Sequence, residues 1–148
     1  MSLQERLNGE IKAAMLAKDA AKLGALRMLK STVGYVQIEK KVESLSDPEF
    51  ISVVQKEVKK RRDSIEQYEK GGRPELAAIE KQEITVLETF LPQPLSPEDL
   101  EKLVREAIAE TGATSKKDMG PVIKAVQAKA AGRAEGKTIS QVVGRLLP

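Results

Sequence analysis

The 148-residue sequence contains no cysteine and no histidine. Without cysteine, the chain has neither a disulfide framework nor a thiol nucleophile. Without histidine, it lacks the commonest general base and the commonest transition-metal ligand. These two absences exclude a Ser-His-Asp triad, a Cys-His pair and a zinc site that uses histidine. We therefore expect no catalytic residues, no metal site and no cofactor in this chain.

Aromatic residues are also scarce, at 3% of the chain, although 41% of its residues are hydrophobic. The core must therefore consist mainly of Leu, Ile, Val, Ala and Met. No run of 18 apolar residues occurs, which predicts that nothing spans a membrane. The first ten residues lack the long apolar stretch of a signal peptide, and so we expect a cytoplasmic location.

Apolar residues recur every three or four positions through most of the chain, which predicts amphipathic helices. Ser2 with Glu5, and Ser46 with Glu49, have the spacing of a capping box at a helix start. Asp19 is a third candidate cap. We expect a helix after each cap, the third over 47–68, and a fourth that begins at Pro74. Alternating apolar and polar runs are missing, so the predicted fold class is all-α.

The segment Leu91-Pro92-Gln93-Pro94-Leu95-Ser96-Pro97 interrupts this pattern, because three prolines within six residues cannot continue a helix. We place a domain boundary here, between 1–92 and 93–148. The second domain is expected to begin with a helix capped by Ser96. A short turn at 116–119 should lead into a helix from Pro121, and Thr138 should cap the last helix. The prediction is an N-terminal four-helix domain followed by a smaller three-helix domain.

Two pairs of residues in the N-terminal helices call for a packing explanation. Gly24 and Gly34 lie inside the second expected helix, where each glycine costs about 1 kcal/mol relative to alanine. Close approach by a neighbouring helix would explain both. Tyr35 and Tyr68 occupy core-like positions, and two single aromatics make a poor platform for stacking nucleic-acid bases.

Five of the seven residues at 56–62 are basic, so this run is a candidate phosphate-binding surface. The alternative is a structural or solvated helix face, and we favour it. Glu57 precedes Arg61 by four residues, a spacing that favours a helical ion pair. Because Arg61 also falls on the apolar stripe, either its stem is buried or it pairs with an acid of another helix.

Carboxylates cluster at Glu80 and Glu83, and again at Glu98, Asp99 and Glu101. Neither group is set among apolar neighbours in a way that indicates a raised pKa. Helix-start acids explain the second group, so we assign no catalytic role to either.

The C-terminal quarter of the chain concentrates positive charge, with seven basic and two acidic residues in 112–148. Glycines among them expose backbone amides and permit close approach by a ligand. This pattern predicts a nucleic-acid surface, while the competing interpretation is a solvated face with turn glycines. The predicted nucleic-acid-binding residues are Lys116, Lys117, Gly120, Lys124, Lys129, Arg133, Lys137 and Arg145.

Several segments together resemble the GatB/YqeY family. They are VKKRRDSIEQY at 58–68 followed by GGR at 71–73, and ETFLP at 88–92. In the tail, KDMG at 117–120 followed by GRAEGK at 132–137 is similar to a motif that YqeY proteins share with the C-terminal end of GatB. GatB is a subunit of the glutamine-dependent tRNA amidotransferase. Pro121 stands where this motif leads us to expect lysine.

The resemblance implies an all-helical protein of two parts with a tail of the kind that contacts tRNA. It associates the chain with an amidotransferase, a carbon–nitrogen ligase that uses glutamine as the amido donor. It does not bring the catalytic domain of that enzyme, so we expect a YqeY-like accessory protein rather than a stand-alone enzyme. The partners it implies are tRNA and an amidotransferase or aminoacyl-tRNA synthetase. The alternative is an adaptor that docks on such an enzyme through protein contacts alone.

Overall fold

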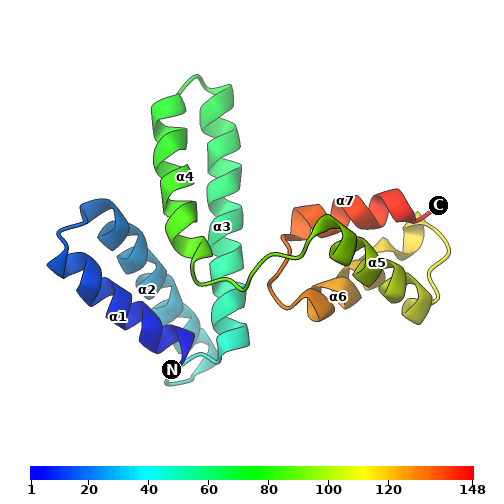
Figure 1. Cartoon of the computed structure of the whole chain (residues 1–148), viewed down its shortest axis with the longest axis horizontal. Coiled ribbons are helices and arrows are strands. Elements are labelled where there is room, and N and C mark those ends of the chain that lie inside the picture. The colour runs from blue at the N-terminus through cyan, green and yellow to red at the C-terminus, as the bar shows by residue number, and fades with distance from the viewer. The chain divides into compact units, whose positions relative to one another are not determined.

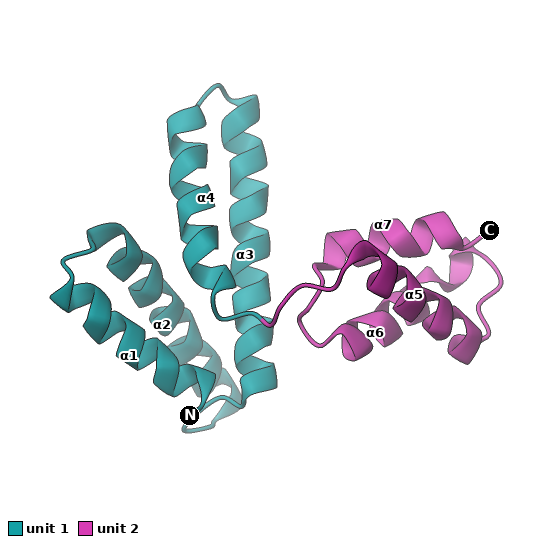
Figure 2. Ribbon diagram, viewed as in Figure 1, with its two compact units in different colours: residues 1–91 teal, residues 92–148 magenta.

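The structure is a computed structural model that describes all 148 residues, Met1–Pro148. It contains seven α-helices, one short 3-10 helix and no strand, which confirms the all-α prediction. The chain divides into two compact units, Met1–Leu91 and Pro92–Pro148 (Figure 2). None of its helices combines the length and the apolar character needed to cross a membrane.

The first unit consists of two helical hairpins (Figure 1). One is formed by α1 (Leu3–Leu16) and α2 (Ala20–Lys40), and the other by α3 (Asp47–Lys70) and α4 (Pro74–Glu88). The caps expected from the sequence are present. Ser2 and Ser46 each form a full capping box, and the Asp19 side chain accepts a hydrogen bond from the Lys22 amide. Side-chain oxygens therefore satisfy backbone donors that a helix start leaves open.

The core of the first unit is largely aliphatic and is centred on two aromatic rings. Phe50 of α3 and Phe90, which follows α4, lie with their ring centroids 5.6 Å apart. The Arg6 guanidinium lies 4.5 Å from the Phe90 centroid and donates a 2.7 Å hydrogen bond to the Thr89 carbonyl. Cations over an aromatic face are attracted by the ring quadrupole. This contact fastens α1 to the end of α4.

The second unit is a three-helix bundle made of α5 (Pro97–Thr111), α6 (Met119–Ala130) and α7 (Gly136–Leu146). The 3-10 turn η1 (Lys116–Asp118) leads directly into α6, and Pro121 lies in the first turn of that helix. Thr138 does not cap α7, contrary to expectation. The N-cap is Glu135, three residues earlier, because the Glu135 carbonyl already accepts a 3.0 Å hydrogen bond from the Ile139 amide.

Two packing expectations for α2 are wrong. Tyr35 is 74% exposed and does not lie in the core, whereas Tyr68 packs against the core of the first unit. Gly24 and Gly34 have no neighbouring atom within 4 Å of the position that a Cβ would take. No helix of this chain approaches them closely, so both glycines remain unexplained by the packing of the chain itself.

Candidate nucleic-acid interface

The second unit is held together by a small aliphatic core to which all three helices contribute. Val104 of α5, Val122 and Val126 of α6, and Ile139 and Val143 of α7 are each at most 1% exposed. With these positions facing inward, the polar residues of each helix are directed outward by the 3.6-residue period. The core therefore decides which side chains of the tail can meet a ligand.

Helices α6 and α7 form an antiparallel hairpin. The Met119 methyl, at the start of α6, lies 3.6 Å from where a Cβ on Gly144 would be, near the end of α7. At the other end of the hairpin, the Gln127 side-chain amide lies 3.6 Å from the corresponding position on Gly136. This pairing fixes which basic residues of the two helices share an end of the hairpin.

Charge is segregated among the helices of this unit. Helix α5 carries five acidic residues, whereas α6 and α7 carry none. The tail's two acids, Asp118 and Glu135, lie at the starts of these two helices. Asp118 has a structural task, since its carboxylate accepts hydrogen bonds from the Thr114 and Ser115 amides at 3.0 and 3.4 Å. The α6–α7 hairpin is thus a surface on which lysine and arginine meet few carboxylates.

Two of the predicted binding residues are paired with acids of α5. The Lys129 ammonium lies 2.8 Å from Glu110, and this hydrogen bond raises the pKa of Lys129. Arg145 lies 3.4 Å from Glu101, whose pKa is lowered chiefly by its hydrogen bond from Arg105 and further by Arg145. A charge that is already paired within the protein gains less from a phosphate than an unpaired one. Lys129 and Arg145 are the weaker members of the predicted set.

Four lysines of the predicted set have no carboxylate partner. Lys116 and Lys117 are exposed in η1, Lys124 is exposed on α6, and Lys137 is exposed on α7. Lys117 and Lys124 are seven residues apart, one on η1 and the other on α6. Lys137 follows Gly136 and therefore lies at the end of the hairpin near Gln127. The unpaired charges extend along the hairpin rather than gathering at one point.

Gly120 and Arg133 complete the predicted set in different ways. Gly120 is exposed between Lys117 and Lys124, with open space where a side chain would be. A ligand can therefore approach the helix backbone closely there. Arg133, in the loop after α6, donates a 2.9 Å hydrogen bond to the Gln93 carbonyl, while its own carbonyl accepts one of 2.8 Å from the Leu95 amide. These two hydrogen bonds hold the segment before α5 against the loop after α6. The positive charge of Arg133 itself has no carboxylate partner.

Exposed amides on the hairpin were missed by the sequence reasoning. Gln127 on α6 and Gln141 on α7 are exposed beside the unpaired lysines. Their side chains can donate to phosphate or sugar oxygens, as such groups commonly do in nucleic-acid interfaces. Only the helix period could have indicated them, because glutamine carries no charge and forms no motif here.

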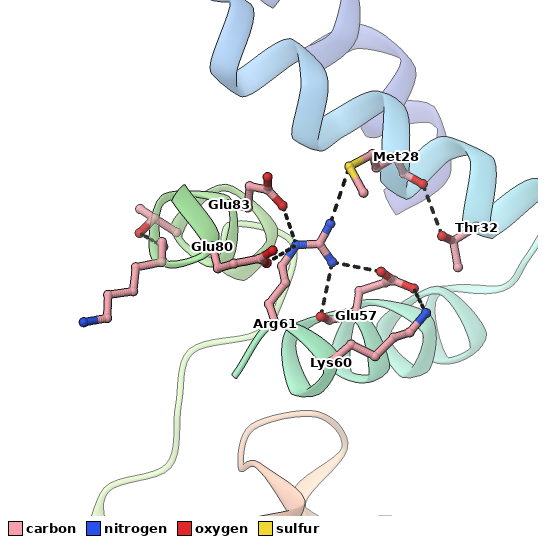
Figure 3. Close-up of polar contacts among 9 residues, drawn as sticks. Met28, Thr32, Glu57, Lys60, Arg61, Glu80 and Glu83 are labelled. Carbon is pink, nitrogen blue, oxygen red and sulfur yellow. Dashed lines mark hydrogen bonds and ion pairs between the residues drawn. The ribbon is translucent and has the colours of Figure 1, made fainter. Parts of the chain in front are cut away.

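The basic run of α3 takes the structural role that the sequence favoured (Figure 3). Arg61 is only 5% exposed, and its guanidinium lies 2.9 Å from the Glu57 carboxylate and 2.8 Å from that of Glu83 on α4. It also lies 3.9 Å from Glu80 and from the Met28 sulfur of α2. Both alternatives left open for Arg61 therefore hold, since its side chain is buried and it also pairs with an acid of another helix.

Neighbouring members of the run are paired as well. Lys59 lies 3.5 Å from Asp63, Lys60 lies 3.6 Å from Glu57, and Arg62 lies 3.6 Å from Glu88. Burial lowers the pKa of Arg61, but the hydrogen bonds to Glu57 and Glu83 outweigh this effect and raise it above its ordinary value. Arg61 is therefore not available to a polyanion, whereas Lys59, Lys60 and Arg62 are exposed but already lie near acids of the chain.

The carboxylates around Arg61 correct one sequence interpretation. Burial raises the pKa of Glu80, and the nearby charge of Glu83 raises it further, against the opposing effect of Arg61. The sequence indicated no raised pKa here, because the burial arises from packing between α3 and α4. Three carboxylates surround the one guanidinium of Arg61. The positive charge of Arg61 is therefore neutralised within the protein, and the cluster is a poor binding site for an external anion.

The molecule is thus a small helical protein whose unpaired tail cations lie on a compact C-terminal bundle. Comparison with known families assigns its class. The Yqey-like protein family matches residues 4–147, nearly the whole chain. The chain belongs to the YqeY-like family.

Curated yeast proteins are similar to the chain. One is "Altered inheritance of mitochondria protein 41, mitochondrial" of Vanderwaltozyma polyspora, 31% identical over 119 residues, which cover 76% of this chain and 64% of that protein. The protein of the same name in Candida glabrata is 35% identical over 107 residues, covering 70% and 59%. That of Saccharomyces cerevisiae strain S288c is 30% identical over 104 residues, covering 69% and 56%. The matched part spans less than two thirds of each relative.

The names of these relatives correct the expected location. All three are described as mitochondrial proteins. This finding contradicts the cytoplasmic location predicted from the composition and the first residues of the sequence. The prediction failed because composition alone says little about the compartment in which a small charged helical protein works.

Proposed function

We propose that this YqeY-like protein is an accessory protein that binds tRNA through the α6–α7 hairpin of its second unit. The observation that carries the proposal is a set of four lysines that have no acidic partner. Lys124 and Lys137 lie on the α6–α7 hairpin, and Lys116 and Lys117 lie on the η1 turn that leads into it. Arg133 adds a fifth unpaired cation in the loop between the two helices. Phosphates are the natural ligands of such a surface.

Shape, rather than base sequence, is the expected basis of recognition. The two tyrosines lie in the first unit, so the hairpin offers no aromatic platform on which bases could stack. Contacts from lysine, arginine and side-chain amides go mainly to phosphates and sugars, which position a protein without reading bases. A folded RNA presents such backbone on a defined surface. The proposed ligand is therefore a folded tRNA, bound with affinity that depends strongly on salt.

The resemblance to the C-terminal end of GatB supports the same ligand. It also favours a place beside a glutamine-dependent amidotransferase or an aminoacyl-tRNA synthetase, with this chain as the binding component. Pro121 is exposed in the first turn of α6, so the lysine expected there would have extended the same surface. Affinity should therefore be moderate rather than high.

Titration of the full chain with total tRNA tests the proposal. We expect a shifted complex in an electrophoretic assay at about 50 mM salt and a large loss of binding at about 200 mM. Duplex RNA of similar length, as competitor, distinguishes folded tRNA from any polyanion. If total tRNA is not bound at the lower salt concentration, the proposal fails. If duplex RNA competes equally, the hairpin recognises phosphate but not the tRNA fold.

A further inference from the structure

Helix α2 has a second apolar face, on the side opposite the core. Its core side is formed by buried residues such as Leu26 and Val33. On the outer side, Met28, Tyr35 and Ile38 are 54%, 74% and 76% exposed, and Val42, just beyond the helix, is 39% exposed. Single exposed apolar residues are ordinary, but Met28, Tyr35 and Ile38 recur along one side of α2. Val42 follows just after the helix end, and the Met28 sulfur also lies 3.9 Å from the Arg61 guanidinium of α3.

The spacing of this outer face matches a helix-pairing seam. Positions 24, 28, 31, 35, 38 and 42 alternate at intervals of four and three, the spacing by which one helix packs along another in a coiled coil. Met28, Tyr35, Ile38 and Val42 supply the large side chains of the seam. Gly24 and Ser31 fill the remaining positions with small ones. We refer to these six residues as the α2 seam.

The two glycines of α2 support a helical partner rather than a flat surface. Gly24 lies in the α2 seam, and Gly34 lies directly beside it. Each weakens the helix by about 1 kcal/mol relative to alanine, and no other helix of this chain has an atom within 4 Å of where its Cβ would be. Small residues let another helix approach the backbone closely. Their positions fit a helix that comes from outside this chain.

Basic residues define the charge of that partner. Arg27 and Lys41, the residue that ends the helix, lie fourteen residues or two heptads apart along one edge of the α2 seam, and Lys30 follows Arg27 by three residues. All three are exposed and form no ion pair within the chain. Glu39 is the only acid of α2, and it lies on the other edge. A helix with carboxylates along one edge of an apolar stripe complements this arrangement.

We propose that the α2 seam docks an acidic amphipathic helix of a partner protein. A second copy of this chain is a poorer occupant in the antiparallel orientation, because that pairing would bring Arg27 of each copy toward Lys41 of the other. The surface lies on the first unit and does not involve the α6–α7 hairpin. The docking of a partner helix can therefore be tested separately from tRNA binding, and either proposal can fail without the other.

Two synthetic helical peptides serve as probes for the full chain. Both carry leucine at the seam positions of three heptads. One has glutamate at the flanking positions, and the other has lysine at the same places. Fluorescence anisotropy should show binding of the glutamate peptide, weakening as salt rises, and no comparable binding of the lysine peptide. Arg27→Glu with Lys30→Glu should reverse this preference.

Paired substitutions locate the surface. Tyr35→Ser with Ile38→Ser should weaken binding of the glutamate peptide by at least about tenfold, as expected for central contacts of an interface. Leu16→Ser with Ile79→Ser removes two apolar side chains that are also exposed, at 86% and 53%, and should leave binding unchanged. All four positions are exposed, so both variants should keep the wild-type circular dichroism spectrum and melting temperature.

Several results would overturn the proposal. Equal loss of binding in the two serine variants, or equal binding of the two peptides, would show that the interaction is not specific to the α2 seam. Sedimentation that reveals a dimer of the chain, lost in the Tyr35→Ser/Ile38→Ser variant, would assign the seam to self-association. Flotation with phosphatidylserine-containing vesicles, lost in the same variant, would assign it to a membrane surface.

Discussion

The basic run of α3 and the basic tail of the second unit differ in what folding does to their charges. The run at 56–62 is the densest in the sequence, yet Arg61 is buried among three carboxylates and Lys59, Lys60 and Arg62 each lie near an acid. The tail is sparser, but four of its lysines have no carboxylate partner. Density along the sequence is therefore a poor measure of the positive charge that a ligand can use.

The difference arises from the helices that pack against each region. Helix α3 lies against α4, which presents Glu80, Glu83 and Glu88 toward the run. In the second unit only α5 is rich in acids, and its carboxylates reach Lys129 and Arg145 but not the other basic residues of α6 and α7. A lysine or arginine is therefore structural where a neighbouring helix places a carboxylate beside it, and is available to a ligand where no such carboxylate lies nearby.

The largest expected effect follows from removing the buried cation of α3. Arg61→Ala should lower the free energy of unfolding by about 3 kcal/mol, because it leaves Glu57 and Glu83 without their partner in a partly buried site. Urea denaturation followed by circular dichroism measures this change. Lys124→Ala, by contrast, should change the free energy of unfolding by less than about 0.5 kcal/mol.

A charge-free replacement of the cluster provides the control. Substituting Arg61, Glu57 and Glu83 together with methionine removes both signs of charge while keeping apolar volume, and should recover most of the lost stability. If Arg61→Ala were as mild as Lys124→Ala, the cluster would not be the structural element described here, and its cation would belong with those of the tail.

A smaller effect should follow from releasing the paired cations of the tail. Glu101→Gln with Glu110→Gln frees Arg145 and Lys129, and should tighten tRNA binding several-fold at low salt. Glu39→Gln with Glu43→Gln changes the net charge equally but releases no cation of the tail, and should tighten binding less. Anisotropy with labelled tRNA compares the two variants. Equal gains would mean that net charge, and not pairing within the second unit, sets the affinity.

Local features of the fold were predictable from the sequence because they depend on neighbouring residues. The capping boxes at Ser2 and Ser46 start helices where expected. The prolines at 92–97 end one helical region and begin another for the same reason, since proline cannot continue a helix. The helix period also placed Arg61 on the apolar side of α3, which left a buried stem and pairing with another helix as the two alternatives.

Features that depend on distant parts of the chain were not predictable in this way. The exposure of Tyr35 follows from α2 packing through its other side, and the raised pKa of Glu80 follows from contact between α3 and α4. The pairing of Lys129 with Glu110 joins residues of two helices. The position of Gly136 inside α7 was missed because Thr138 offered a more obvious cap. For the candidate interface, the sequence indicated the region but not which of its cations are unpaired.

The salt dependence of tRNA affinity tests most directly whether the unpaired lysines of η1, α6 and α7 form the binding surface. Lys117→Ala, Lys124→Ala and Lys137→Ala, combined, should reduce the slope of log affinity against log salt by about 2, since each lost phosphate contact removes about 0.7–0.9. The matched control, Lys12→Ala with Lys56→Ala and Lys102→Ala, removes the same charge from outside the hairpin and should leave the slope nearly unchanged. Equal slopes for the two variants would contradict the account.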